Sequence, residues 1–247
     1  MGMIGGGQVV EWVPRSRPPD LEEAGVHVWH LDLSQPDLDP AVLSEAERER
    51  AGKFAFSHLQ ERYVAAHVQT RMLLGAYLSR DPAAIEYWVS VRGKPHLAGG
   101  ELHFNLSHTA GHALLAVCRS AEIGVDVECV SRNLDRNGIA ERFFSTSEAE
   151  ALKLLPDHAQ AEGFFGLWTR KEAWLKATGI GISDGLSRVE FNCDPAEAPR
   201  VVRIDGSEDS AAGWQVLSLR PLADHIAAVA WQGPPFAVET FRFASAR

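Results

Sequence analysis

The sequence predicts an α+β protein of two similar halves, each a mainly antiparallel sheet with helices. Short segments in which apolar and polar residues alternate with period two follow one another closely, as in antiparallel strands. Longer stretches with one apolar side fall between them, as in amphipathic helices. This succession occurs loosely in both halves of the chain without a low-complexity linker, so the halves are expected to pack closely.

The first half contains two expected helices among its strands. Ser44, with Glu47 three residues later, forms a capping box that opens the first helix. The second helix has a long apolar side and is stopped by Asp81-Pro82. The expected elements are a strand at 26–33, helices at 44–53 and 58–78, and strands at 86–91, 102–106 and 112–118, with a turn at 93–95.

The second half begins with a strand that carries two acids. A helix is expected to open near Ser145 or Ser147, and Ser147-Glu148-Ala-Glu150 offers a capping box. A longer helix ends at Gly179. The expected elements are a strand at 123–130, these two helices, and strands at 186–192, 214–219 and 225–231. We place the boundary between the halves at 1–121 and 122–247.

Composition excludes several classes of protein. The 247 residues carry a formal net charge of -9, which argues against broad nucleic-acid binding because that needs a basic face. No apolar run is long enough to cross a bilayer, and the start lacks a signal-peptide pattern. The three cysteines have no disulfide-type or metal-type spacing. We therefore expect a soluble, cytoplasmic protein that binds neither membrane nor nucleic acid.

The segment Phe164-Phe-Gly-Leu-Trp-Thr-Arg-Lys-Glu-Ala-Trp-Leu-Lys176 places Glu172 and Lys176 one helical turn apart. Residues four apart share a helix face, so a carboxylate and an ammonium project side by side. An ordinary exposed Glu–Lys pair would explain these two residues taken alone. Two further acids, considered with this pair, favour a functional site over an ordinary ion pair.

Those acids are Asp126 and Glu128, in Ile123-Gly-Val-Asp-Val-Glu-Cys-Val130. The period-two alternation points them to one face of a strand and Val125 and Val127 to the other. A solvated strand face would also show this pattern. With Glu172 as a third acid, however, the set suits Mg²⁺, or Mn²⁺ in its place, bound together with phosphate oxygens. The sequence therefore favours metal-assisted attack on a diphosphate.

Other motifs add phosphate-binding groups without offering a nucleophile. Lys94 lies on a Gly-Lys-Pro turn, and Ser107-His108 ends a strand, where free N–H groups suit an anion. No Gly-x-Ser-x-Gly elbow surrounds Ser107, so nucleophilic catalysis is disfavoured. Neither a dinucleotide fingerprint nor a Walker A loop occurs.

Taken in order, these segments form a recognisable set. They are Gly93-Lys-Pro95, Phe104-Asn-Leu-Ser-His108, Ile123-Gly-Val-Asp-Val-Glu128, Arg142-Phe-Phe-Ser145 and Trp168-Thr-Arg-Lys-Glu-Ala-Trp-Leu-Lys176. The chain resembles the surfactin-type (group II) 4′-phosphopantetheinyl transferases over about residues 44–182. The resemblance implies a monomer whose two halves are related by pseudo-twofold symmetry and bind coenzyme A between them. It implies transfer of the phosphopantetheine arm to a serine of an acyl or peptidyl carrier protein, releasing adenosine 3′,5′-bisphosphate.

The resemblance also implies roles for residues of this chain. Asp126, Glu128 and Glu172 would hold Mg²⁺. Glu172 would also act as the base, directly or through water, and Lys176 would contact the diphosphate and the leaving group. The remaining implied contacts with coenzyme A come from Arg50, Arg62 or Arg71, Lys94, Ser107 and His108. Glu47 stands where some relatives have a lysine, and His67 where an arginine is frequent, so the choice between Arg62 and Arg71 stays open.

Two other functions use the same residues. A metal-dependent hydrolase of coenzyme A or nucleotide diphosphates would use water as the acceptor in place of a carrier serine. A binding module for coenzyme A or for carrier protein would need no catalysis, and the intact set of three acids disfavours it. The sequence does not reveal which carriers are modified or whether acyl-coenzyme A is accepted.

Overall fold

The computed structural model describes residues 10–35, 38–181, 185–193 and 197–244. Five α-helices occur in this part of the chain: α1 Glu45–Ala51, α2 Ser57–Leu78, α3 Arg136–Phe143, α4 Thr146–Leu154 and α5 Asp157–Thr178. The first seven strands are β1 Val13–Arg15, β2 Gly25–Asp32, β3 Tyr87–Val89, β4 Pro95–Leu97, β5 His103–Thr109, β6 His112–Cys118 and β7 Ile123–Cys129. The others are β8 Val189–Phe191, β9 Val201–Ile204, β10 Trp214–Leu219, β11 His225–Gln232 and β12 Ala237–Phe243.

The same succession of elements occurs twice, which confirms the predicted α+β class with two similar halves. In the first half, β2, α2, the β3–β4 hairpin, β5 and β6 follow one another, and the strands lie in the order β2-β6-β5. In the second half, β7, α5, the β8–β9 pair, β10 and β11 do the same, in the order β7-β11-β10. Both three-stranded units are antiparallel, as predicted.

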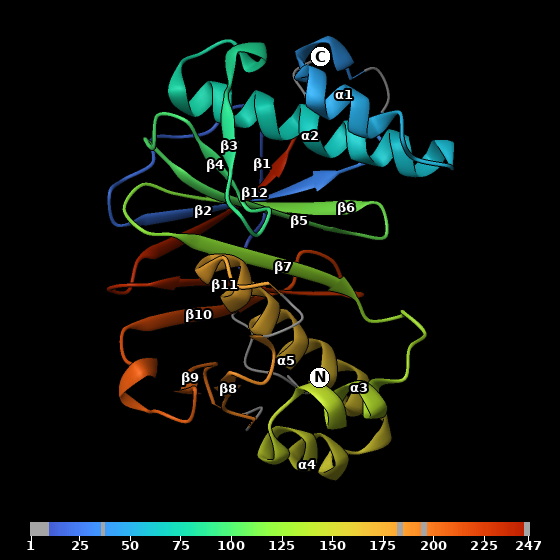
Figure 1. The fold of residues 1–247 in the computed structure, drawn as a ribbon, viewed down its shortest axis with the longest axis vertical. Helices are drawn as coiled ribbons and strands as arrows, with labels where there is room; N and C mark the ends of the chain where they lie inside the picture. Colours follow the sequence, from blue (N-terminus) through green and yellow to red (C-terminus); the bar gives the residue numbers. More distant parts are fainter. Residues whose placement is uncertain (1–9, 36–37, 182–184, 194–196, 245–247) are drawn as a thin grey trace.

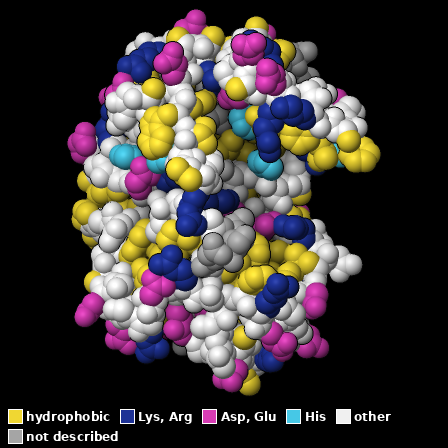
Figure 2. Space-filling model, in the orientation of Figure 1, with side chains coloured by type: hydrophobic (Ala, Val, Ile, Leu, Met, Phe, Trp, Pro, Cys, Tyr) yellow, Lys and Arg dark blue, Asp and Glu magenta, His cyan; other side chains and the backbone are white. Residues whose placement is uncertain are grey.

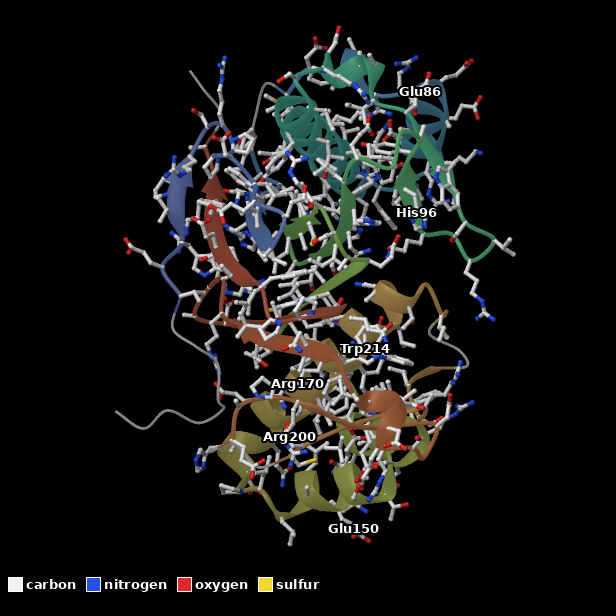
Figure 3. All side chains as sticks on the ribbon, turned by 90° about the vertical axis from the view of Figure 1, so that its left-hand side faces the viewer. Glu86, His96, Glu150, Arg170, Arg200 and Trp214 are labelled. Atoms are coloured by element: carbon white, nitrogen blue, oxygen red, sulfur yellow. The ribbon has the colours of Figure 1, made fainter. Side chains whose placement is uncertain are left out.

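The two sheets pack face to face between the long helices, which gives four layers (Figure 1). Between the sheets lies an apolar layer of alternate residues from β2, β6, β7 and β11, including Val28, Leu114, Val125 and Val229. Helix α2 covers the outer face of the first sheet. Helix α5 lies on the outer face of the second, where Trp174 packs against Trp214 of β10 at 5.7 Å between ring centroids (Figure 3).

The end of the chain returns to the first half. β12 pairs parallel with β2, and β1 pairs parallel with β12, so the first sheet has the order β1-β12-β2-β6-β5. The sequence did not predict β1, β4, β9, β12 or helix α3. The division into 1–121 and 122–247 remains a prediction, and the crossing of β12 ties the two segments together.

Each half contains one buried cation–carboxylate pair of the same design. In the first half, Arg71 of α2 meets Glu47, the capping-box residue of α1, at 2.7 Å. Arg71 also donates to the carbonyl groups of Pro82 and Ile85, at 3.0 and 2.9 Å, in the segment after its helix.

In the second half, Lys171 of α5 meets Glu148 at 2.8 Å, with both side chains fully buried. Glu148 caps α4 from the third position, and the capping serine is Ser145. The predicted Ser147–Glu150 box is therefore wrong, since Ser147 lies inside the helix. Lys171 also donates to the carbonyl groups of Leu186 and Val189. Thus one side chain fixes a short helix, a long helix and the segment that follows.

We expect Lys171→Met to destabilise the protein by about 3–5 kcal/mol, because it leaves Glu148 buried without a counter-charge. Lys153→Met is the matched control: Lys153 forms an exposed pair with Glu141, and its loss should leave the free energy of unfolding unchanged. Urea unfolding of both variants measures the difference. Equal destabilisation would contradict this role for the buried pair.

Candidate functional site: three acids and a lysine where the two sheets meet

Helix α5 lies unusually close to β7, and Gly124 permits this. A Cβ atom at Gly124 would lie 2.0 Å from the carbonyl oxygen of Ala173 and 2.4 Å from the amide nitrogen of Ala177. The neighbouring strand β11 presents Ala228 and Ala230 to the same helix. With no larger side chain in between, the acidic face of β7 and the Glu172 face of α5 come together.

Asp126, Lys176 and Ser107 form a closed set of polar contacts. The ammonium of Lys176 lies 2.6 Å from Asp126 Oδ1 and donates to Ser107 Oγ at 2.9 Å. The hydroxyl of Ser107 donates to Asp126 Oδ1 at 2.8 Å. The structure thus brings together residues predicted from three separate segments of the sequence.

The site lies where an edge strand of one sheet meets an edge strand of the other. β5 ends the first sheet and β7 ends the second. Asn105 Oδ1 accepts a hydrogen bond from the Val125 amide at 2.9 Å, which satisfies an edge group of β7. Thr109 Oγ1 donates to Glu128 Oε2 at 3.3 Å. Alternate side chains of β5 therefore align it with the acidic strand.

Glu128 has a cationic partner, Arg132, that was not expected from the sequence. Arg132, four residues on, donates to both carboxylate oxygens of Glu128 at 2.7 Å. The Arg132 side chain is about half exposed, so solvent and ligands reach this pair.

Glu172 is buried in an environment that disfavours its charge. Its side chain has no hydrogen-bond partner for Oε1, and the residue is 3% exposed. Burial, and next the charge of Asp126, raise the pKa of Glu172 to about 7; Lys176 opposes this and Glu128 adds to it. The charges of Asp126 and Glu128 therefore both act on Glu172.

The donor set fits a hard divalent cation. Asp126 Oδ2 is buried without a partner, like Glu172 Oε1, and unpaired buried carboxylate oxygens are costly unless a cation compensates them. Carboxylates are the ligands that Mg²⁺ and Mn²⁺ prefer. The three carboxylates are not, however, among the described side chains whose ligand atoms already gather within 4.8 Å of one another. The ammonium of Lys176 lies at Asp126 instead.

A pocket of about 450 Å³ opens beside these groups. Glu172 and Lys176 line it together with the 92–95 turn and the glycine-rich end of α5. Lys94 belongs to the pocket wall, but its ammonium is already bound: it donates to Glu122 Oε2 at 2.5 Å and to the carbonyl groups of Ile123 and Ala177. Lys94 therefore links the 92–95 turn to β7 and α5.

Arg92 is a candidate that the sequence analysis missed. It is exposed on the same turn as Lys94 and lines the pocket. A second basic residue beside Gly93-Lys94 was the signal for it. Figure 2 shows Lys and Arg side chains around the hollow where the two halves meet, although the whole chain is acidic.

The structure separates the two arginines that the sequence left open. Arg71 is 1% exposed, and its guanidinium is bound within the buried pair described above, so a ligand does not reach it. Arg62 is exposed and lines a smaller pocket of about 160 Å³ with His108. Partial burial, then the charge of Lys176, lower the pKa of His108. Arg50 lies exposed at the end of α1.

Comparison with known proteins identifies the family. The model of the 4′-phosphopantetheinyl transferase superfamily matches residues 122–230. The chain is 37% identical over 232 residues to the 4′-phosphopantetheinyl transferase HetI of a Nostoc species, covering 90% of this chain and 94% of that protein. It is 31% identical to a 4′-phosphopantetheinyl transferase of Bacillus subtilis, covering 62% of this chain and 67% of that protein. The chain belongs to the 4′-phosphopantetheinyl transferase superfamily.

Among solved structures, the holo-[acyl-carrier-protein] synthase of Helicobacter pylori, in complex with coenzyme A, matches 44% of this chain and 96% of that chain. The identity is 25% and the TM-score 0.33. No helix in the described part of this chain is long and apolar enough to cross a membrane.

The raised pKa of Glu172 predicts a specific dependence of stability on pH. The folded state binds this proton more tightly than the unfolded state, whose carboxyl keeps a pKa near 4.5. The resulting stabilisation is complete below pH 4.5 and is lost as the pH rises to about 7. Without metal, wild type should therefore lose about 3 kcal/mol over this range relative to Glu172→Gln.

Urea unfolding at several pH values in the presence of a chelator measures this difference. Glu150→Gln, at an exposed carboxylate on α4, is the matched control. A difference between wild type and Glu172→Gln that stays constant with pH would show that the Glu172 proton is not bound more tightly in the folded protein.

Proposed function

We propose that this protein transfers the 4′-phosphopantetheine arm of coenzyme A to a serine of an acyl or peptidyl carrier protein. One observation carries the proposal: a buried carboxylate with an unpartnered oxygen, Glu172, lies with Lys176 on the wall of a pocket beside two more acids. Membership of the transferase superfamily supports it. The protein would act as a cytoplasmic monomer.

Asp126, Glu128 and Glu172 would hold Mg²⁺, with Mn²⁺ as an alternative. When bound, the ion neutralises charge on the diphosphate of coenzyme A. The two unpartnered oxygens of Asp126 and Glu172 are available as ligands without breaking any protein hydrogen bond. Glu128 would exchange part of its contact with the half-exposed Arg132.

Glu172 is suited to take the proton of the attacking serine. A base works best when its pKa lies near the working pH; burial raises the pKa of Glu172 to about 7 in the metal-free protein, and a bound cation would lower it. The serine oxygen forms a bond to the phosphorus that carries the pantetheine arm. The bond from that phosphorus to the bridging oxygen breaks, and adenosine 3′,5′-bisphosphate leaves with the electron pair. Glu172, directly or through a water, accepts the serine proton.

Lys176 is placed to stabilise the leaving phosphate. Its ammonium now donates to Asp126 and Ser107. The same N–H groups can turn toward a phosphate oxygen, and a charge-assisted hydrogen bond to phosphate is strong. Ser107 and His108 would bind phosphate nearby. Arg92 would meet the nucleotide end in the larger pocket, which Lys94 helps to shape. Arg50 and Arg62 would meet the 3′-phosphate, with Arg71 acting only within the fold.

Loading of an apo carrier protein tests the proposal. With coenzyme A and Mg²⁺, wild type should add the mass of the arm to the carrier, and Glu172→Gln should be slower by about 10²–10⁴-fold because the general base is lost. Asp205→Asn, in an exposed pair with Arg188, is the control and should load at the wild-type rate.

Mass spectrometry of the carrier and quantification of adenosine 3′,5′-bisphosphate report the two products. Cleavage of coenzyme A at the same rate without a carrier would show that the protein is a diphosphate hydrolase and not a transferase. A Glu172→Gln variant as fast as wild type would show that this carboxylate does not take part.

A further inference from the structure

A layer of histidines and one cysteine closes one end of the apolar interface between the two sheets. His30 follows Val26 and Val28 on the inner face of β2, and Cys129 follows Val125 and Val127 on the inner face of β7. His112 and His225 take the same place on β6 and β11, before Leu114 and Ala227. Four strands therefore direct nitrogen or sulfur ligand atoms to one end of the sandwich.

These side chains contact one another across the sheets. His30 Nε2 lies 3.1 Å from His112 Nδ1. The ring of His112 meets that of His225 edge to face, with 5.1 Å between centroids. Cys129 and His225 are direct partners in the register of β7 and β11.

Three of the side chains gather their ligand atoms closely. Cys129, Asp224 and His225 each place one ligand atom within 4.8 Å of the others. Cys129 Sγ lies 3.8 Å from Asp224 Oδ2, and His225 Nδ1 lies 2.8 Å from Asp224 Oδ1. A sulfur and an oxygen ligand on a tetrahedral Zn²⁺, with Zn–S near 2.3 Å and Zn–O near 2.0–2.2 Å, lie roughly 3.5 Å apart. The 3.8 Å between Cys129 Sγ and Asp224 Oδ2 is close to this value.

One atom of the cluster lacks a partner. His225 is 3% exposed, and its Nε2 has no hydrogen-bond partner among the described residues. Nε2 lies on the other side of the ring from Nδ1, so the ring atom that faces Asp224 is Nδ1, and a cation there would take the place of the proton that Nδ1 and Asp224 Oδ1 now share. Asp224 is largely exposed, which gives an ion a path from solvent.

We propose that Cys129, Asp224 and His225 form a binding site for a borderline divalent cation of the Zn²⁺ type, with His112 as the nearest further imidazole. Sulfur and nitrogen ligands favour Zn²⁺ and Co²⁺ over Mg²⁺, whereas the all-carboxylate set around Asp126 has the opposite preference. Binding displaces the thiol proton of Cys129 to solvent. Ser131, whose Oγ lies 3.0 Å from Cys129 Sγ, would orient the thiolate. The site ties β7 and β11 to the 224–225 turn, independently of the transfer reaction.

Titration of the purified protein with Co²⁺, in excess Mg²⁺ to fill the carboxylate site, tests the proposal. We expect one equivalent of Co²⁺ to produce thiolate-to-metal charge-transfer absorption, with Zn²⁺ displacing it. Zn²⁺ should also raise the melting temperature, and a chelator should reverse this. Because this absorption reports sulfur ligation in the wild type, its absence overturns the proposal whatever the variants do.

Variants assign the ligands. Cys129→Ser and His225→Gln should each weaken Zn²⁺ binding at least about tenfold, measured by competition with a chromophoric chelator. Cys193→Ser and His158→Gln change a cysteine and an exposed histidine outside the cluster and should bind like wild type. Glu172→Gln should keep the cobalt absorption, which separates this site from the catalytic one. Equal affinity in Cys129→Ser and wild type would refute the assignment.

Discussion

The close packing of α5 on β7 is the constraint on which the site depends. Gly124 is the point of contact, since any side chain there would collide with the backbone of the helix at Ala173 and Ala177. The same approach buries Glu172 and places Lys176 on Asp126. Desolvation and the neighbouring acids then hold Glu172 partly protonated near neutral pH. Packing, rather than any single hydrogen bond, thus creates both the unpaired oxygens and the raised pKa of Glu172.

The repeated architecture explains why the site lies between the halves. Each half buries a long helix through a cation that also meets a capping carboxylate, Arg71 with Glu47 and Lys171 with Glu148. The two sheets face one another across an apolar layer, and their edge strands β5 and β7 meet along one side. Edge strands leave polar groups unsatisfied, and here side chains such as Asn105 satisfy them while their neighbours face the acids.

The sequence predicted much of the site because its signals are local. Period-two alternation placed Asp126 and Glu128 on one face, and helical spacing paired Glu172 with Lys176. The capping box at Ser44 and Glu47 is confirmed for the same reason. The contact between Lys176 and Asp126, by contrast, depends on two elements 50 residues apart and on the small residue at Gly124.

The contacts that the sequence did not reveal are those between groups far apart along the chain. Arg71 looks like any basic residue until the carbonyl groups of Pro82 and Ile85 are seen around it. The same holds for Lys94, which meets a carbonyl of α5. Ser145 and Ser147 offer similar caps, and two distant partners of Glu148 favour Ser145: the Lys171 ammonium and the Phe191 amide, which donates to Glu148. The cysteines lack metal-type spacing in sequence, yet Cys129 meets His225 through strand pairing.

The most direct test of the central claim is the position of a divalent cation. Crystals grown with coenzyme A and Mn²⁺ would locate the ion by its anomalous scattering. We expect one ion within roughly 2.2 Å of carboxylate oxygens of Asp126 and Glu172, with Lys176 moved off Asp126. An ion bound without either of these carboxylates, or none in the presence of coenzyme A, would contradict it.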